Sequence, residues 1–167
     1  NQRGESAMHG ASGPLQVADQ QSPREISNAF VRAAMECGIP RNDDFNDGVR
    51  QEGAGLYQVT QFHGGAKNGE RCSAAAAYLH PVMSARSNLT VMTGVQAQRV
   101  LLDERRATGV EIRRDGETDT LFARREVVLC GGAFNTPQLL MLSGIGDPEE
   151  LVRHGIAVRH ALPGVGR

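Results

Sequence analysis

Two adjacent glycines stand where the chain could bind a nucleotide through its backbone. Gly131 and Gly132 directly follow Glu126–Cys130, an apolar and β-branched run that predicts a buried strand. Glycines at a strand end permit positive φ angles and let a ligand approach the main chain closely. A helix start comes next, and the positive end of a helix favours phosphate or other electron-rich groups. The order of strand, glycine turn and helix therefore suits a nucleotide-type ligand, with plain helix–strand packing as the alternative explanation.

The helix behind the glycines has recognisable start and stop signals. Asn135 or Thr136 can cap it, with Pro137 at its first helical position. The apolar stretch that follows ends at Ser143–Gly144, a small-residue exit typical of helix C-termini. Gly144-Ile-Gly146 is a poor match to the opening of a dinucleotide fingerprint, because it follows a helix rather than a strand, and no complete G-x-G-x-x-G occurs in the chain.

The remaining residues of catalytic or metal-binding type form no recognisable constellation. The acidic loop at residues 43–48 fails as a calcium loop, since Phe45 and Ala54 would stand at ligand positions. A solvated turn explains this loop better. The histidines lack metal-type spacing, and the three cysteines form no C-x-x-C pair. We therefore assign no catalytic residues and no metal ligands from the sequence.

Composition excludes several classes of function. The chain has 167 residues, a net charge of −1 and a pI of about 6.6, so nothing favours electrostatic binding of nucleic acid. No apolar run approaches the roughly 20 residues that a transmembrane helix needs. The isolated cysteines fit a reducing compartment.

In the first half of the chain, the pattern predicts two helices and a strand. Ser22–Glu25 has the form of a capping box with Pro23 at the first helical position, and Gly38 ends the helix. Leu56–Phe62 alternates between apolar and polar residues and predicts a strand. Ser73 is expected to cap a short alanine-rich helix. The first predicted helix has an apolar face formed by Ile26, Ala29, Phe30, Ala33 and Ala34.

The second half of the chain has a mainly β pattern. A three-stranded meander is predicted, with a bend at Gly94 and a type I′ hairpin at Asp115–Gly116. Asp147–Glu150 predicts a capped helix that ends at Gly155. The meander strands are predicted at Leu89–Leu102, Thr108–Arg113 and Thr118–Arg124, and a last short strand at Ile156–Val158. The expected fold class is α+β, with a β-meander, short helices and a soft domain boundary near Ser87–Asn88.

Several segments together resemble the glucose–methanol–choline (GMC) family of FAD-dependent alcohol oxidoreductases, and the bacterial choline dehydrogenase-like members most of all. The fifteen residues Gly132–Gly146 match the family's second signature. Nearly the whole chain is covered. The other matching segments are His9-Gly10-x-x-Gly13-Pro14-Leu15, Gly69-x-Arg71-x-Ser73, Asn88–Gly94, Thr108–Glu111 and Leu162–Gly166.

The resemblance implies a function and a set of site residues. Residues 1–87 would belong to a substrate-binding domain and residues 88–167 to an FAD-binding domain. By likeness, Ala97 stands where the backbone meets the adenine, and Gly131 and Gly132 lie near the same half of FAD. Family members pass hydride from an alcohol to the flavin, so the implied substrate is an alcohol and the implied cofactor is FAD.

The departures from the family pattern are equally informative. The G-x-G-x-x-G phosphate loop is absent from this sequence, as is the family's carboxy-terminal segment with its catalytic histidine. We therefore expect an internal fragment that neither binds FAD nor turns over by itself. A self-standing binding or interaction module on the same scaffold is the alternative. A cytoplasmic location is implied, with membrane association of the parent enzyme left open. Self-association through exposed sheet surface is expected as well.

Overall fold

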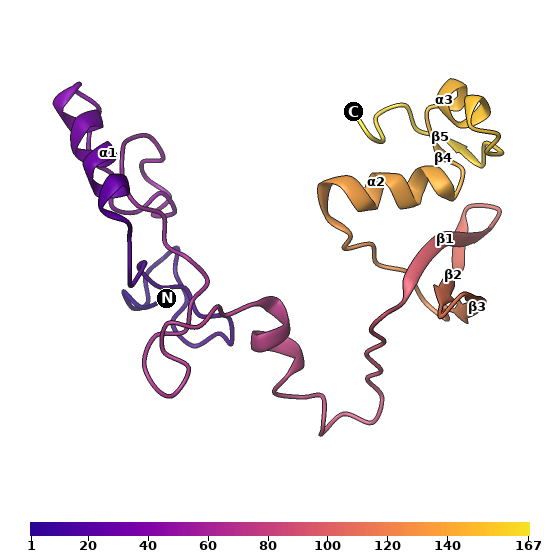
Figure 1. The fold of residues 1–167 in the computed structure, drawn as a ribbon, viewed down its shortest axis with the longest axis horizontal. Helices are drawn as coiled ribbons and strands as arrows, with labels where there is room; N and C mark the ends of the chain where they lie inside the picture. The colour runs from indigo at the N-terminus through magenta and orange to yellow at the C-terminus, as the bar shows by residue number, and fades with distance from the viewer. The chain divides into compact units, whose positions relative to one another are not determined.

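Three α-helices, one π-helical turn and five strands make up the fold, which a computed structural model describes over residues 1–167 (Figure 1). The chain divides into two compact units, Asn1–Thr90 (unit 1) and Val91–Arg167 (unit 2). The division lies close to the boundary expected near Ser87–Asn88. Helices and an antiparallel sheet occur in one chain, which confirms the predicted α+β class.

Unit 1 consists mostly of loops held by isolated bridges. The expected strand at Leu56–Phe62 is wrong, because Val59 and Gln61 make only single bridges, to Ala18 and Arg71. An alternating pattern marks residues that can pair, but no neighbouring segment runs beside this one long enough to form a ladder. Ala18 and Cys72 are fully buried, and they mark the small core that these bridges surround.

Helix α1 spans Glu25–Glu36, and its start differs from the prediction. Arg24 is the N-cap residue with an extended ψ of 144°, and no side chain caps the helix. The capping box at Ser22–Glu25 is therefore wrong, as is the helical position of Pro23. Just ahead of the helix, Gln21 Nε2 donates a hydrogen bond to Asn68 Oδ1 at 2.8 Å.

The end of α1 and the second helical segment follow local signals. Gly38 has a φ of 86°, and its N–H donates to the Met35 carbonyl, so the predicted glycine stop is confirmed. The Ser73 hydroxyl accepts a hydrogen bond from the Ala76 N–H at 3.1 Å, as expected for a cap. The segment Ala75–Leu79 (η1) is nevertheless π-helical, with the His80 N–H bonded to the Ala75 carbonyl.

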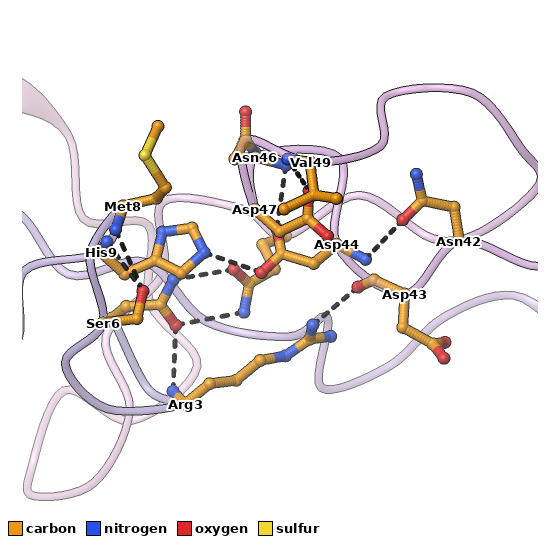
Figure 2. A network of polar contacts seen from close by, with 12 residues as sticks. Arg3, Ser6, Met8, His9, Asn42, Asp43, Asp44, Asn46, Asp47 and Val49 are labelled. Atoms are coloured by element: carbon orange, nitrogen blue, oxygen red, sulfur yellow. Dashed lines mark hydrogen bonds and ion pairs between the residues drawn. The ribbon is translucent and has the colours of Figure 1, made fainter.

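A polar network organises the acidic loop of unit 1 (Figure 2). The buried Asn42 amide donates to the carbonyls of Arg50 and Glu52, and its oxygen accepts from the Asp44 N–H. Asp44 Oδ2 lies 2.7 Å from His9 Nε2 and joins the loop to the amino-terminal segment. Asp47 accepts from two backbone amides of the same loop, those of Val49 and Arg50. The carboxylates thus serve the turn, as the sequence indicated.

These contacts predict that unit 1 loses stability in acid. A backbone hydrogen bond from Asn46, followed by the His9 contact, holds the pKa of Asp44 below its ordinary value. A carboxylate with a lowered pKa stabilises the fold fully above the ordinary Asp pKa of about 3.9, and this contribution is lost as pH falls through the folded-state value. Urea unfolding between about pH 5 and 2.5 should therefore show falling stability. Asp44→Asn should flatten this dependence, and an unchanged pH profile in that variant would contradict the assignment.

Unit 2 contains the predicted three-stranded antiparallel meander in the order β1-β2-β3. Strand β1 spans Gln96–Asp103, β2 spans Arg106–Arg114 and β3 spans Glu117–Phe122. Strand β1 begins later than expected, beyond Gly94, whose φ of 68° turns the chain. The β2–β3 turn has positive φ at both central residues, Asp115 at 52° and Gly116 at 89°, which confirms the hairpin signal.

The strand expected at Glu126–Cys130 is wrong. The segment runs without helix or strand assignment between β3 and the next helix, and Val128 is 71% exposed. An apolar β-branched run forms a strand only when a neighbour supplies hydrogen bonds. Among the strands of residues 1–167, none pairs with this segment.

Helix α2 spans Gly132–Leu142 and begins before the predicted caps. Asn135, Thr136 and Pro137 lie inside it, so the predicted start is wrong. Gly131 directly precedes the helix, and its N–H donates to Thr136 Oγ1 at 3.0 Å. The predicted capping hydroxyl therefore lies about one turn inside the helix instead of at its start. The predicted end at Ser143–Gly144 is confirmed, since Ser143 is the C-cap and Gly144 has a φ of 82°.

The remainder of unit 2 is a capped helix between two short strands. Helix α3 spans Pro148–Arg153, and Asp147 accepts a hydrogen bond from the Glu149 N–H, so the predicted cap is confirmed. The last strand is not at Ile156–Val158. Instead β5 (His160–Ala161) pairs in parallel with β4 (Ile145–Gly146), because Gly144 already binds the amides of residues 159 and 160.

Candidate functional site

A cavity of about 570 Å³ opens in unit 2 between the start of β1 and one face of α2. Ala97 and Gly131, both predicted to contact a cofactor, line it together. Gly132 is not among the lining residues, but it follows Gly131 with a φ of 81°. The other lining residues are Val95, Gln96, Gln98, Val110, Val127, Val128, Leu129, Cys130, Asn135, Thr136, Gln138, Leu139 and Leu142.

Strand β1 supplies one wall of the cavity and leaves its backbone accessible. It is the edge strand of the sheet, with β2 on one side and no strand on the other. The register shifts between Ala97 and Arg99, so Gln98 has no partner across the ladder. A bulge on an edge strand frees main-chain groups for a ligand, and the small side chain of Ala97 lets the ligand come close.

One face of α2 supplies the opposite wall. Asn135, Gln138, Leu139 and Leu142 follow one another at spacings of three or four residues, so they share one face of the helix. In Figure 1, α2 lies beside β1 in unit 2, where the two elements contact each other. A side chain at Gly131 would come within 2.9 Å of Asn135 Cβ, so only glycine fits this approach to the helix.

No charged side chain lines this cavity. Its polar groups are the amides of Gln96, Gln98, Asn135 and Gln138 and the hydroxyl of Thr136. The Thr136 hydroxyl already accepts the Gly131 N–H. Apolar surface with a few amide groups suits a flat, neutral heterocycle whose edges carry donors and acceptors. The cavity therefore fits the base and sugar of a nucleotide better than its phosphates.

Sequence reasoning missed the amide residues and Cys130 at this site. The three-to-four spacing along α2 was readable in principle, but the predicted helix began too late to include Asn135. The glutamines of β1 carry no motif, because their role depends on the register shift beside Ala97.

None of the titratable clusters of the chain lines this cavity. Within residues 1–167, no three His, Cys, Asp or Glu side chains gather closely enough to hold a metal ion. His154, at the C-terminal end of α3, lies 3.0 Å from Glu150 on the exposed surface of the same helix. This contact is local to one helix, whereas the His9–Asp44 contact joins two segments that are distant in sequence.

None of the helices has the length and apolar content required to cross a membrane.

Comparison with known proteins identifies relatives of the whole chain. The GMC oxidoreductase family matches residues 1–167. The chain is 46% identical to an alcohol dehydrogenase (acceptor) of Pseudomonas putida over 100% of its length, which is 30% of that protein. It is 43% identical to the mitochondrial choline dehydrogenase of Homo sapiens, covering 98% of this chain and 26% of the relative. The chain thus spans less than a third of these curated relatives.

Two solved structures share the fold of this chain. Pyridoxine 4-oxidase from Mesorbium loti superposes with a TM-score of 0.74 at 31% identity, covering 93% of this chain and 29% of the other. An FAD-dependent oxidoreductase from Chaetomium thermophilum superposes with a TM-score of 0.78 at 26% identity, covering 96% and 27%. With the family match over its full length, the chain belongs to the GMC oxidoreductase family.

Proposed function

We propose that this chain is part of an FAD-dependent alcohol oxidoreductase and supplies the wall that holds the adenosine half of FAD. The observation that carries the proposal is the uncharged cavity that brings Ala97 and Gly131 together. The named relatives support FAD as the cofactor and an alcohol as the substrate, because they include an FAD-dependent oxidoreductase and the choline and alcohol dehydrogenases.

The residues present fit the adenosine half of the cofactor. Backbone groups of β1 at Ala97 can pair with the edge of the adenine, and the amides of Gln96 and Gln138 can reach polar edges of base or sugar. The apolar residues between them exclude water from the ring faces. When bound, the flavin supplies the redox chemistry by accepting a hydride from the alcohol. This chain's part is to bind and orient the far end of the cofactor.

The same reasoning assigns the two units to different parts of the parent enzyme. Unit 2 contains the cavity and the signature Gly132–Gly146, so it corresponds to the FAD-binding part, and residues 1–87 correspond to the substrate-binding part. A cytoplasmic location is proposed for the chain, with membrane association of the parent enzyme left open. The 167 residues contain neither a complete G-x-G-x-x-G nor the family's carboxy-terminal segment with its histidine, so the chain alone should be inert.

An FAD titration followed by flavin fluorescence tests whether the isolated chain is inert. We expect no saturable quenching at micromolar FAD and no oxidation of choline or primary alcohols with an artificial electron acceptor. One wall of the site leaves little binding energy beyond the cost of association. The FAD-dependent oxidoreductase from Chaetomium thermophilum serves as the positive control. Purification of this chain with stoichiometric FAD would refute the proposal that it is inert. If the chain is instead a self-standing binding module, it should bind a partner or ligand in a stoichiometric ratio.

Uncovered apolar side chains on unit 2 predict self-association of the isolated chain. Phe122, Val128 and Phe134 are 82%, 71% and 88% exposed. Burying such side chains is favourable by about 1.5–3 kcal/mol each. Size-exclusion chromatography at increasing concentration should show species larger than a monomer, and Phe122→Ser with Phe134→Ser should shift the profile toward the monomer. A monomeric profile of the unmodified chain at all concentrations would refute this proposal.

A further inference from the structure

Ser143 occupies a buried position where the end of α2 meets β1. It is 7% exposed, and its hydroxyl donates to the Leu139 carbonyl at 2.6 Å within the same helix. The same oxygen accepts the Val100 N–H of β1 at 2.8 Å. One hydroxyl thus makes a bond inside the helix and a bond from the helix to the sheet.

The bond to Val100 differs from an ordinary helix-capping contact. A serine at the C-terminal end of a helix can end that helix through backbone hydrogen bonds alone. The Ser143 N–H already makes such bonds, to the Leu139 and Leu140 carbonyls. The Val100 amide belongs to a strand 43 residues away in sequence and is itself buried. The hydroxyl satisfies this amide on the free edge of β1, where no further strand can do so.

This contact lies next to the cavity and joins its two walls. Ala97 precedes Val100 on the same strand, and Leu139 and Leu142 line the cavity from the same helix that Ser143 ends. Leu142 also lines the neighbouring hollow that contains Val100 and Ser143. The separation of strand and helix at this point therefore sets the width of the cavity.

We propose that Ser143 is a positioning residue for the adenosine half of the cofactor: by binding both Val100 and Leu139, it holds β1 and α2 at the spacing that the base requires. This inference rests on the proposed function. Ser143 acts through β1 and α2 and has no role in the chemistry. Removing the hydroxyl leaves the buried Val100 amide unsatisfied, and the strand can recover a partner, such as water, only by moving away from the helix.

The test uses AMP as the probe and Cys130 as the reporter. Cys130 is exposed and lines the cavity, whereas Cys37, also exposed, lies in unit 1 and serves as the internal reference. Alkylation of each thiol is followed by peptide mass spectrometry as AMP is increased. AMP should slow alkylation of Cys130 with a midpoint of about 1 mM and leave Cys37 unchanged.

Three variants separate positioning from general stability. Ser143→Ala should weaken protection of Cys130 by about tenfold. Ser143→Thr keeps the hydroxyl and should restore protection to within about threefold. Leu151→Val removes one buried methylene group from α3, away from the cavity, and should leave protection unchanged although it lowers stability to a similar degree.

The outcomes distinguish the two proposals. If AMP fails to protect Cys130 in the unmodified chain, the proposed adenosine site is refuted and the positioning role with it. If AMP protects the unmodified chain and folded Ser143→Ala equally, only the positioning role is refuted. Equal loss of protection in Ser143→Ala and Leu151→Val would also refute it, because the effect would follow stability alone.

Discussion

Replacing Gly55 by alanine should destabilise unit 1 by about 3 kcal/mol or more. A Cβ at this position would lie 1.8 Å from the Asn42 carbonyl oxygen, which is backbone and cannot rotate away. Asn42 must then move, and its buried amide would lose its bonds to the Arg50 and Glu52 carbonyls. The effect is large because a single methyl group disturbs both the packing and the network that organises the acidic loop.

Urea unfolding followed by tyrosine fluorescence measures this loss. The chain has two tyrosines, Tyr57 and Tyr78, and both lie in unit 1. Tyr57 packs against Phe45 with ring centroids 4.7 Å apart, so it reports on the loop directly. Gly13→Ala is the matched control, because a Cβ there meets nothing within 4 Å and the backbone needs no positive φ. Equal stability of the two variants would contradict the account of unit 1.

Replacing Gly144 by alanine should destabilise unit 2 by about 2–4 kcal/mol. Gly144 has a φ of 82°, and a Cβ would lie 2.4 Å from the Ala157 carbonyl oxygen. Its own carbonyl also accepts the amides of Arg159 and His160. The substitution therefore strains the backbone, creates a clash and displaces the end of α2 beside Ser143.

Gly155→Ala isolates the contribution of backbone strain. Gly155 has a φ of 69°, but a Cβ there meets nothing within 4 Å, so this variant should lose only about 1 kcal/mol. Hydrogen exchange of the β1 amides measures both variants, since neither tryptophan nor tyrosine lies in unit 2. A loss in Gly144→Ala no larger than in Gly155→Ala would show that the close contact with Ala157 does not constrain the fold.

The sequence predicted best those features that depend on a few adjacent residues. The hairpin at Asp115–Gly116 needs only two residues that tolerate positive φ, and the cap at Asp147 needs only the next helical amides. The stop at Ser143–Gly144 is local in the same way. These signals hold because no distant part of the chain competes with them.

Prediction failed where distant contacts decide the structure. The capping box at Ser22–Glu25 does not form, and the residue before it, Gln21, binds Asn68, which is far along the chain. The run Glu126–Cys130 has the composition of a strand, but a strand exists only where another pairs with it. The start of α2 is an exception, because its shift accompanies a local contact: Thr136 accepts the Gly131 amide from inside the helix.

The candidate site shows the same division. The resemblance to a known family identified Ala97 and Gly131, and the structure brings both to one cavity. The amides of Gln98 and Asn135 could not be inferred, because one depends on a shift in strand register and the other on where a helix begins. The roles of Gln98 and Asn135 in cofactor binding stay predictions, as do those of Ala97, Gly131 and Gly132.

An AMP titration observed in the amide spectrum of the ¹⁵N-labelled chain tests the central claim most directly. If the cavity between β1 and α2 holds the adenosine half of FAD, the amide signals of Ala97, Gly131 and Gly132 should move most, with a midpoint of about 1 mM AMP, while signals of unit 1 stay in place. Absence of any shift up to about 10 mM AMP, or shifts confined to residues 1–90, would contradict the claim.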